Sequence, residues 1–325
     1  MEYKHIKGID KPISQIVLGT IMLTPEKQEY SDMILDTALE LGVTCFDTAW
    51  GYGGGACERA IGSWFERRGT RDKVVLVTKC AHPTKDRMHS MPYDILSEYH
   101  DSEARLGKGM VDIYMLHRDD QSLPVGPTVE TMNRLKEQGK INQYGGSNWT
   151  ARRIEEANEY AYKYGLYPMA ISSPNYGLGE QIGEMWGHGS VSLSQKGMEE
   201  DKAWYAKTQL AIFAYSSLGR GWFSGKFNRE TFAEYKPNLE IFCTRVYEHE
   251  GNFKRLDRCF ELAAEKGVKV PQIALAYVLN NREMNLFALV GAHNREEIED
   301  AVETAGLKLT EKEMAWLDLR ADSRN

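Results

Sequence analysis

Short apolar runs alternate with amphipathic stretches along almost the whole chain. Eight runs rich in Val, Ile, Leu and Phe have the length of strands, and we expect strands at 16–18, 43–46, 74–78, 112–116, 141–145, 169–172, 210–215 and 286–290. Apolar residues at helical spacing and end signals predict helices at 28–41, 57–67, 93–106, 128–137, 151–164, 271–279 and 295–304. The strands are continuously apolar, which is typical of a parallel sheet covered by helices.

Eight such strands with helices between them favour a closed (β/α)8 barrel, the TIM barrel of the α/β class. The 325 residues would allow two domains of about 150 residues each, but barrels of this size are commonly single, so we expect one domain over 1–325. The first 14 residues precede the barrel and are predicted to form a hairpin that plugs its bottom. Two long connections, 176–196 and 221–251, are expected on the C-terminal face, where long barrel loops often cover substrates.

Composition narrows the class of protein further. The chain is 42% hydrophobic and 27% charged, as in soluble globular proteins, and its net charge of -7 disfavours binding to nucleic acid or to an anionic membrane surface. No run approaches the roughly 18 apolar residues that span a bilayer, and the start leads into no apolar signal core. The five scattered cysteines form no CxxC pair, which favours reduced thiols in the cytoplasm over a disulfide or zinc framework.

Titratable side chains recur where predicted strands end. Asp47, Lys79 and His117 each follow or end an apolar run, and Tyr52 lies five residues after Asp47. The C-terminal ends of barrel strands share one face, so these four groups should gather there. A free tyrosine has a pKa of about 10, and a neighbouring ammonium would lower it. An Asp would keep that lysine charged, and a neutral His could donate a hydrogen bond to a carbonyl. Such a set suits proton transfer during carbonyl reduction.

A glycine run beside Tyr52 offers an alternative interpretation. Residues 51–56, GYGGGA, formally fit the G-x-G-x-x-A pattern of a Rossmann dinucleotide-binding loop. That loop should follow the first strand, and an acid should end the next strand. Here the next strand ends in Lys79 instead, so we favour glycines that let Tyr52 approach the barrel mouth.

Several motifs resemble those of the aldo-keto reductase family, in the expected order. They include FDTAWGYG at 46–53, VTK at 77–79, DIYMLHR at 112–118, GGSNW at 145–149 and YSSLGRG at 215–221, followed by Gly225 and Lys226. The resemblance runs from about residue 16 to 304. It implies that Tyr52 is the general acid, that Lys79 and Asp47 tune it, and that His117 orients the carbonyl. Two alternatives stay open: a nicotinamide-binding regulatory barrel, and a sugar isomerase or eliminase that uses bound NAD as a redox relay.

The resemblance also implies a nicotinamide cofactor, NADP(H) or NAD(H). Its implied contacts are Gly19, Thr20, Ser147, Asn148, Ser173, Tyr215, Ser216, Ser217, Leu218, Arg220, Gly291, His293, Asn294 and Glu297. Tyr215 would stack under the nicotinamide ring, and the residues after it would wrap the pyrophosphate. The chain departs from the family pattern in two regions. Ser173 replaces a glutamine, and His293, Asn294 and Glu297 stand where NADPH-preferring relatives carry cations, so we expect a weakened NADPH preference.

Substrate contacts are expected from His117 and from aromatic residues around the predicted barrel mouth. The candidates are Trp50, Trp149, Trp186, His188 and Trp222, of which Trp50 and Trp149 are the main predictions. Trp186 and Trp222 would serve equally well as core residues. Aromatic faces suit apolar carbonyls or the C–H faces of sugars. Segments 185–192 and 201–205 resemble sugar-associated branches of the family and favour polyol or carbohydrate substrates.

Overall fold

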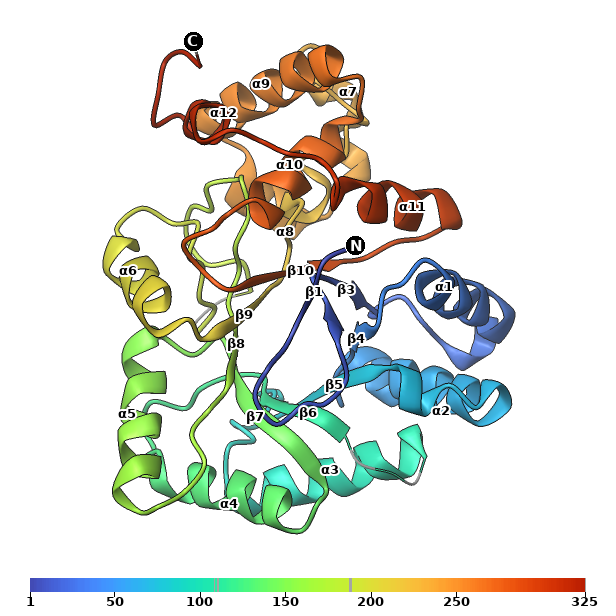
Figure 1. Ribbon diagram of the computed structural model, residues 1–325, viewed down its shortest axis with the longest axis vertical. Helices are drawn as coiled ribbons and strands as arrows, with labels where there is room; N and C mark the ends of the chain where they lie inside the picture. The colour runs from blue at the N-terminus through green and yellow to red at the C-terminus, as the bar shows by residue number, and fades with distance from the viewer. Residues whose placement is uncertain (108, 110, 187–188, 325) are drawn as a thin grey trace.

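The computed structural model describes residues 1–107, 109, 111–186 and 189–324. Eight parallel strands close into a barrel in the order β10-β3-β4-β5-β6-β7-β8-β9, so that the last strand pairs with the first (Figure 1). The strands are β3 (Ile16–Gly19), β4 (Cys45–Asp47), β5 (Val75–Cys80), β6 (Val111–Leu116), β7 (Ile141–Ser147), β8 (Ile171–Ser173), β9 (Ala211–Ala214) and β10 (Leu286–Val290). The predicted (β/α)8 barrel is confirmed.

Helices surround the ring of strands in Figure 1. Those predicted from the sequence are α1 (Gln28–Glu40), α2 (Ala56–Arg68), α3 (Pro92–Leu106), α4 (Gly126–Glu137), α5 (Ala151–Lys163), α10 (Val270–Leu279) and α11 (Arg295–Thr304). The structure adds α6 (Glu199–Thr208), α7 (Phe232–Tyr235), α8 (Ile241–Tyr247), α9 (Glu250–Lys266) and α12 (Glu311–Leu317). The connection 221–251 is thus partly helical, because α7 and α8 lie within it.

The predicted N-terminal hairpin is present and closes one end of the barrel. Strands β1 (Tyr3–Lys4) and β2 (Ile13–Ser14) pair antiparallel, and the segment crosses the centre of the ring in Figure 1. Ile6, Ile9 and Ile13 are buried against the side chains that fill the barrel interior. Lys4 Nζ donates to the carbonyl of Leu286, the first residue of β10. The hairpin therefore seals the N-terminal end and leaves the opposite end for a site.

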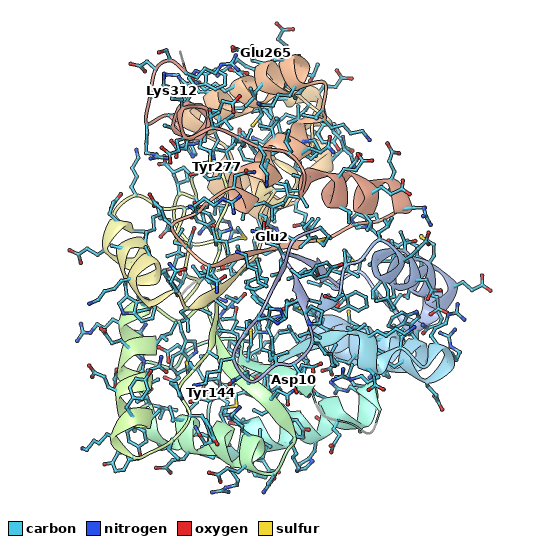
Figure 2. All side chains as sticks on the ribbon, viewed as in Figure 1. Glu2, Asp10, Tyr144, Glu265, Tyr277 and Lys312 are labelled. Atoms are coloured by element: carbon cyan, nitrogen blue, oxygen red, sulfur yellow. The ribbon has the colours of Figure 1, made fainter. Side chains whose placement is uncertain are left out.

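Side chains alternate between the barrel interior and the layer under the helices. Those of Val77, Met115, Ile171 and Phe213 share one buried interior cluster. The layer outside the strands is filled by larger side chains such as Tyr144 (Figure 2), which is fully buried. Because alternate residues of a strand point to the same side, the residue two positions after each interior residue continues the interior column. Those positions hold the polar side chains of the C-terminal end.

Candidate active site

Asp47 and Lys79 form a buried ion pair at the ends of β4 and β5. Lys79 Nζ lies 2.6 Å from Asp47 Oδ1 and donates to the carbonyl of Thr48 at 2.8 Å. Both side chains are only 2% exposed. Burial disfavours the lysine charge, but the Asp47 carboxylate and the Tyr52 oxygen outweigh it and hold the pKa of Lys79 above its ordinary value. The lysine is therefore a fixed cation inside the barrel mouth.

Tyr52 lies over this cation. Its hydroxyl is 3.5 Å from Lys79 Nζ, which also lies 5.0 Å from the centre of the tyrosine ring. Burial raises the pKa of Tyr52, whereas Lys79 acts to lower it, and the net direction is upward. The sequence predicted only the effect of the lysine, because the degree of burial depends on the closed barrel.

The glycines after Tyr52 make a tight turn. They belong to a 3₁₀ segment, η2 (Tyr52–Gly55), and Gly53, Gly54 and Gly55 have φ angles of +56°, +61° and +86°. Residues with side chains rarely adopt this left-handed conformation, so glycine is needed at these positions. The turn carries the chain from β4 into α2 and leaves Tyr52 at the mouth. It does not follow the first barrel strand, so the Rossmann interpretation is wrong.

His117 follows β6 and completes the group. Its ring meets Tyr52 edge-on, with 5.6 Å between the ring centres, and the side chain is 8% exposed. Burial, helped by the charges of Lys79 and Arg118, holds the pKa of His117 well below its ordinary value, so the ring is neutral. Its buried Nδ1 atom has no hydrogen-bond partner among the described residues. An unpaired buried acceptor is tolerated more often than an unpaired donor, which favours the tautomer with its proton on Nε2.

Ser147, Asn148, Ser173 and Tyr215 occupy the neighbouring strand ends of β7, β8 and β9. Ser147 Oγ donates to the Ser173 carbonyl at 2.9 Å and accepts from Asn148 Nδ2 at 3.1 Å. The Tyr215 hydroxyl donates to Asn148 Oδ1 at 2.7 Å. Ser173 Oγ donates to the carbonyl of Phe213 at 2.7 Å. The four residues expected at the nicotinamide end are therefore one connected group, with the tyrosine ring held in place by its hydroxyl.

The indole ring of Trp186, in the long connection 176–196, lies against the ring of Tyr215. The ring of Trp186 lies 5.3 Å from it, centre to centre, with 39° between the planes. The guanidinium groups of Arg118 and Arg220 lie 5.6 and 5.4 Å from the centre of the Trp186 ring. An aromatic ring thus lies in tilted contact with Tyr215, on the residue expected to stack under the nicotinamide.

The loop after Tyr215 contains four residues with a left-handed backbone conformation. Ser216, Gly219, Arg220 and Gly221 have φ angles of +54°, +60°, +52° and +95°. Two of these residues are not glycine, and such strain concentrates at functional sites. Turns of this kind direct successive backbone N–H groups into a concavity. Ser217 Oγ donates to Ala214 O at 2.9 Å and Leu218 precedes the short η4 turn (Gly219–Gly221), so all predicted pyrophosphate residues lie in this loop.

Arg220 is the cation of that loop, and Glu240 binds it. Arg220 Nε donates to Glu240 Oε2 at 2.8 Å, and the arginine side chain is 23% exposed. Glu240 directly precedes α8, within the second long connection. The guanidinium thus remains accessible beside the turn.

The loop between β10 and α11 holds the residues predicted at the 2′ end. Asn294 caps α11 by accepting from the N–H of Glu297 at 2.9 Å, and Glu297 Oε2 accepts from the N–H of His293 at 2.8 Å. The nearby Arg295 donates to both carboxylate oxygens of Glu40, at 2.8 and 3.0 Å. Lys226 Nζ lies 3.8 Å from Glu297 Oε1. The acidic residue predicted at this end, Glu297, therefore has a lysine beside it, Lys226, for which the sequence indicated no role.

Gly19, Thr20 and Gly291 lie at the C-terminal ends of the first and last barrel strands. Gly19 pairs in register with Asp47, and Thr20 Oγ1 donates to the Asp47 carbonyl at 2.9 Å. A side-chain carbon added at Gly291 would lie 3.2 Å from Met22 Cε, a tight contact. Gly19 and Thr20 therefore lie beside Asp47, and Gly291 lies beside Gly19; their contact with a cofactor ribose stays a prediction.

The predicted substrate residues differ in position. Trp50 is partly exposed, and its Nε1 donates to Asp101 of α3 at 3.0 Å. Trp149 is 3% exposed and packs in the core outside the barrel strands, so its position favours a structural role. Trp222 is fully buried among Phe227, Phe232 and Phe253. His188 lies outside the described residues.

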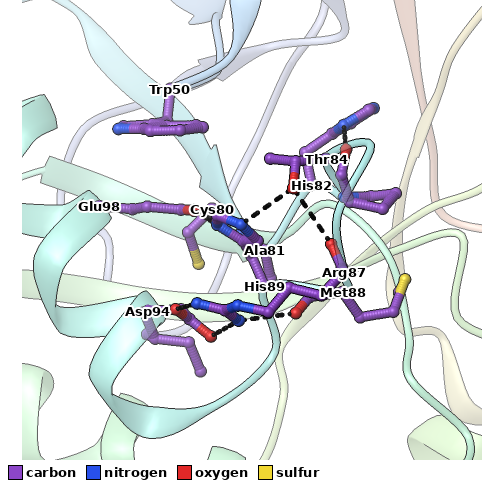
Figure 3. Close-up of polar contacts among 12 residues, drawn as sticks. Trp50, Cys80, Ala81, His82, Thr84, Arg87, Met88, His89, Asp94 and Glu98 are labelled. Atoms are coloured by element: carbon purple, nitrogen blue, oxygen red, sulfur yellow. Dashed lines mark hydrogen bonds and ion pairs between the residues drawn. The ribbon is translucent and has the colours of Figure 1, made fainter.

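One histidine that sequence reasoning passed over faces the site. His82 lies in the loop after β5, shown in Figure 3, and its ring centre is 4.8 Å from that of His117. The only signal in the sequence was a second histidine three residues after Lys79. Within the described residues, no cluster of three or more His, Cys, Asp or Glu side chains could hold a metal ion. No described helix is long and apolar enough to cross a bilayer.

The geometry defines a (β/α)8 barrel whose open end gathers a neutral imidazole, a tyrosine hydroxyl and a paired lysine. A sequence model of the Aldo/keto reductase family matches residues 15–320, and the chain belongs to this family. The Aldo-keto reductase YhdN of Bacillus subtilis is 28% identical over 328 residues, which cover 96% of this chain and 91% of the relative.

Two solved structures share the fold. An aldo-keto reductase from Klebsiella pneumoniae in complex with NADPH has a TM-score of 0.72 at 23% identity, covering 98% of this chain and 95% of that one. The glycerol dehydrogenase AKR11B4 from Gluconobacter oxydans has a TM-score of 0.75 at 24% identity, covering 97% and 94%. By its family, the chain is an NAD(P)-dependent oxidoreductase that interconverts carbonyl and alcohol groups of small molecules.

Proposed function

We propose that the protein reduces an aldehyde, ketone or keto-sugar with Tyr52 as the general acid, and runs the reverse oxidation with the same residue as base. The observation that carries this proposal is the Tyr52 hydroxyl 3.5 Å from an ammonium that the buried Asp47 holds 2.6 Å away. A bound nicotinamide cofactor supplies or takes up the hydride. As the carbonyl oxygen gains negative charge, Tyr52 gives it the phenolic proton, and the Lys79 cation stabilises the phenolate that remains.

His117 would position the carbonyl. In the neutral tautomer proposed above, Nε2–H donates a hydrogen bond, and the ring lies beside Tyr52. A carbonyl oxygen that accepts from His117 is therefore held next to the acid. A neutral donor also avoids placing a second positive charge beside Lys79.

The chain's own residues fit a nicotinamide cofactor. Tyr215 would offer the flat face of its ring to the nicotinamide, and its tilted contact with the Trp186 ring supports this assignment. Ser147, Asn148 and Ser173 would hold the carboxamide, and the strained turn from Ser216 to Arg220 would face the pyrophosphate. The Trp186 indole must move aside or shift along the ring for nicotinamide to stack there.

Replacing Tyr52 by phenylalanine tests the acid. Tyr52→Phe removes the proton donor and keeps the ring, so we expect kcat to fall by about 10²–10⁴-fold while cofactor affinity stays nearly unchanged. Steady-state kinetics with an aldehyde panel and cofactor binding by fluorescence measure the two effects. The exposed Tyr93→Phe serves as the control, since Tyr93 is 78% exposed. Near-normal kcat in Tyr52→Phe would contradict the assignment, and tight cofactor binding without turnover of any substrate would favour a regulatory barrel.

We further propose that NADH is accepted and that preference for NADPH is weak. Glu297 would repel a 2′-phosphate and can accept a hydrogen bond from a 2′-hydroxyl, while Glu40 and Glu299 already bind Arg295. Lys226, 3.8 Å from Glu297, is a nearby cation that would act in the opposite direction.

Cofactor affinities measure this preference directly. We expect the two dissociation constants to differ by less than about tenfold, and Glu297→Gln to shift the ratio toward NADPH by roughly threefold to tenfold. Glu303→Gln, at an exposed position on the same helix, is the matched control. NADPH binding about a hundredfold tighter than NADH in the unchanged protein would refute the proposal.

A further inference from the structure

His82 stands next to the histidine that would orient the substrate. It lies two residues after β5, and its ring meets that of His117 at 75°, with 4.8 Å between the ring centres. The side chain is partly exposed. A substrate carbonyl that reaches His117 therefore brings its neighbouring atoms close to His82.

Hydrogen bonds to α3 hold the loop that carries His82 in place. The N–H of Ala81 donates to Glu98 Oε2 at 2.7 Å, and the other oxygen of Glu98 lies 2.8 Å from His89 Nδ1 (Figure 3). Arg87 binds Asp94 of α3 through two hydrogen bonds. Ala81 has a φ of +59°, a conformation that a residue with a side chain keeps only where its surroundings impose it. His82 is thus placed by a fixed loop.

The hydrogen bond to Pro83 determines which nitrogen of His82 carries the proton. His82 Nδ1 lies 2.9 Å from the carbonyl oxygen of Pro83, and a carbonyl oxygen only accepts, so Nδ1 is the donor. Burial lowers the pKa of His82. The bond to Pro83 opposes this shift, and Arg118 and His89 add to it. In the neutral ring, Nε2 carries a lone pair and is an acceptor.

The two neighbouring imidazole rings therefore have opposite hydrogen-bonding roles. His117 presents a donor and His82 presents an acceptor. A carbonyl group with a hydroxyl on the adjacent carbon matches this pair, because the carbonyl accepts and the hydroxyl donates. In the oxidative direction, a vicinal diol has the same two oxygens.

We propose that His82 is a specificity-determining residue that accepts a hydrogen bond from a hydroxyl adjacent to the reacting carbonyl. The site thereby prefers 2-hydroxy carbonyl compounds, or vicinal diols in reverse, over analogues without that hydroxyl. This inference rests on the proposed carbonyl reduction and names a substrate class for it.

A matched pair of substrates isolates this contact. Glyceraldehyde and 3-hydroxypropanal have the same three-carbon chain, the same aldehyde and the same terminal hydroxyl, and only glyceraldehyde has the hydroxyl adjacent to the carbonyl. His82→Phe keeps a ring against His117 and removes the acceptor. His82→Gln restores an acceptor, and His100→Gln changes an exposed histidine of α3 as the control. The readout is the ratio of kcat/KM for the two aldehydes within each variant, because a merely structural defect lowers both alike.

We expect the unchanged protein to favour glyceraldehyde. His82→Phe should lower kcat/KM for glyceraldehyde by about tenfold, or ~1.4 kcal/mol, and that for 3-hydroxypropanal by less than about twofold. His82→Gln should recover part of the ratio, and His100→Gln should leave it unchanged.

Two outcomes would overturn the proposal in distinguishable ways. Equal losses for both aldehydes in His82→Phe would refute the role of His82 and leave the reductase function standing. Reduction of neither aldehyde by the unchanged protein, nor of any member of the wider carbonyl panel, would refute the proposed function and the inference with it.

Discussion

At the scale of single residues, the Lys79 ammonium is the centre of the site. Three oxygen atoms surround it: Asp47 Oδ1, the carbonyl of Thr48 and the Tyr52 hydroxyl. A buried charge without partners would cost several kcal/mol, and a paired one still gains little stability over apolar residues of similar volume. The ion pair is thus better explained by its chemistry than by the stability of the fold.

Replacing Lys79 should separate the contribution of the ion pair to activity from its contribution to stability. Lys79→Met leaves the Asp47 carboxylate buried and unpaired, so we expect a loss of about 3–5 kcal/mol in the free energy of unfolding, and loss of activity. The double variant Lys79→Met with Asp47→Asn removes the unpaired charge, and it should recover most of the stability but none of the activity. Urea unfolding and kcat measure the two. Activity recovered together with stability would show that the ion pair only supports the fold.

At the scale of elements, α2 and α3 pack outside the barrel and support the loop at its C-terminal end. Arg105 of α3 donates to the Trp50 carbonyl at 3.0 Å and pairs with the buried Glu58 of α2 at 3.1 Å. Glu58 in turn accepts from Thr78, the neighbour of Lys79, at 2.6 Å. The two helices approach closely at Gly62, where an added side-chain carbon would lie 2.2 Å from the carbonyl oxygen of Arg105. Their spacing therefore positions the loop that carries Trp50 and Tyr52.

Gly62→Ala should force these helices apart. We expect a loss of about 1–3 kcal/mol in the free energy of unfolding, because the added carbon collides with backbone and cannot be relieved by turning a side chain. Denaturant unfolding measures it, and the exposed Glu66→Ala on the same helix is the control. If Gly62→Ala were as stable as the unchanged protein, the close packing of α2 on α3 would not be as tight as described.

Helices were predictable where their buried apolar residues recur at helical spacing along the sequence. Helix α5 buries Ala151, Ile154, Ala157 and Ala161, a spacing visible in the chain. Helix α6 buries only Tyr205, so no apolar stripe marks it. Helix α9 buries Leu256, Cys259 and Leu262 at helical spacing, so its sequence carries the same signal, although it is not among the helices predicted above.

At the scale of the whole molecule, neutral His117 links the site to the stability of the fold. Its pKa in the native barrel lies well below the ordinary value of 6.5 because it is buried beside Lys79 and Arg118. Below about pH 6.5 the unfolded chain takes up a proton at this position and the native protein does not. Unfolding therefore consumes a proton, and falling pH favours the unfolded state.

The free energy of unfolding should thus decrease on acidification through this residue. Between about pH 6.5 and 5 we expect His117 to contribute a fall of up to ~1.4 kcal/mol per pH unit. His117→Gln cannot take up this proton, so its stability should fall less steeply, while the exposed His100→Gln should follow the unchanged protein. Urea unfolding across this pH range gives the slopes. Parallel slopes for His117→Gln and the unchanged protein would show that His117 is protonated in the native state.

The sequence by itself determined the order of the strand–helix units and the residues at their ends. Both are local properties, because strand runs, helical spacing and strand ends are each contained in a few consecutive residues. The tertiary structure decided which groups meet. Closure of the barrel brought His82 to His117 and Trp186 onto Tyr215, it paired Arg295 with Glu40 across 255 positions, and it buried Tyr52 enough to raise its pKa. Contacts, burial and charge compensation depend on all the chain segments at once, and no local pattern contains them.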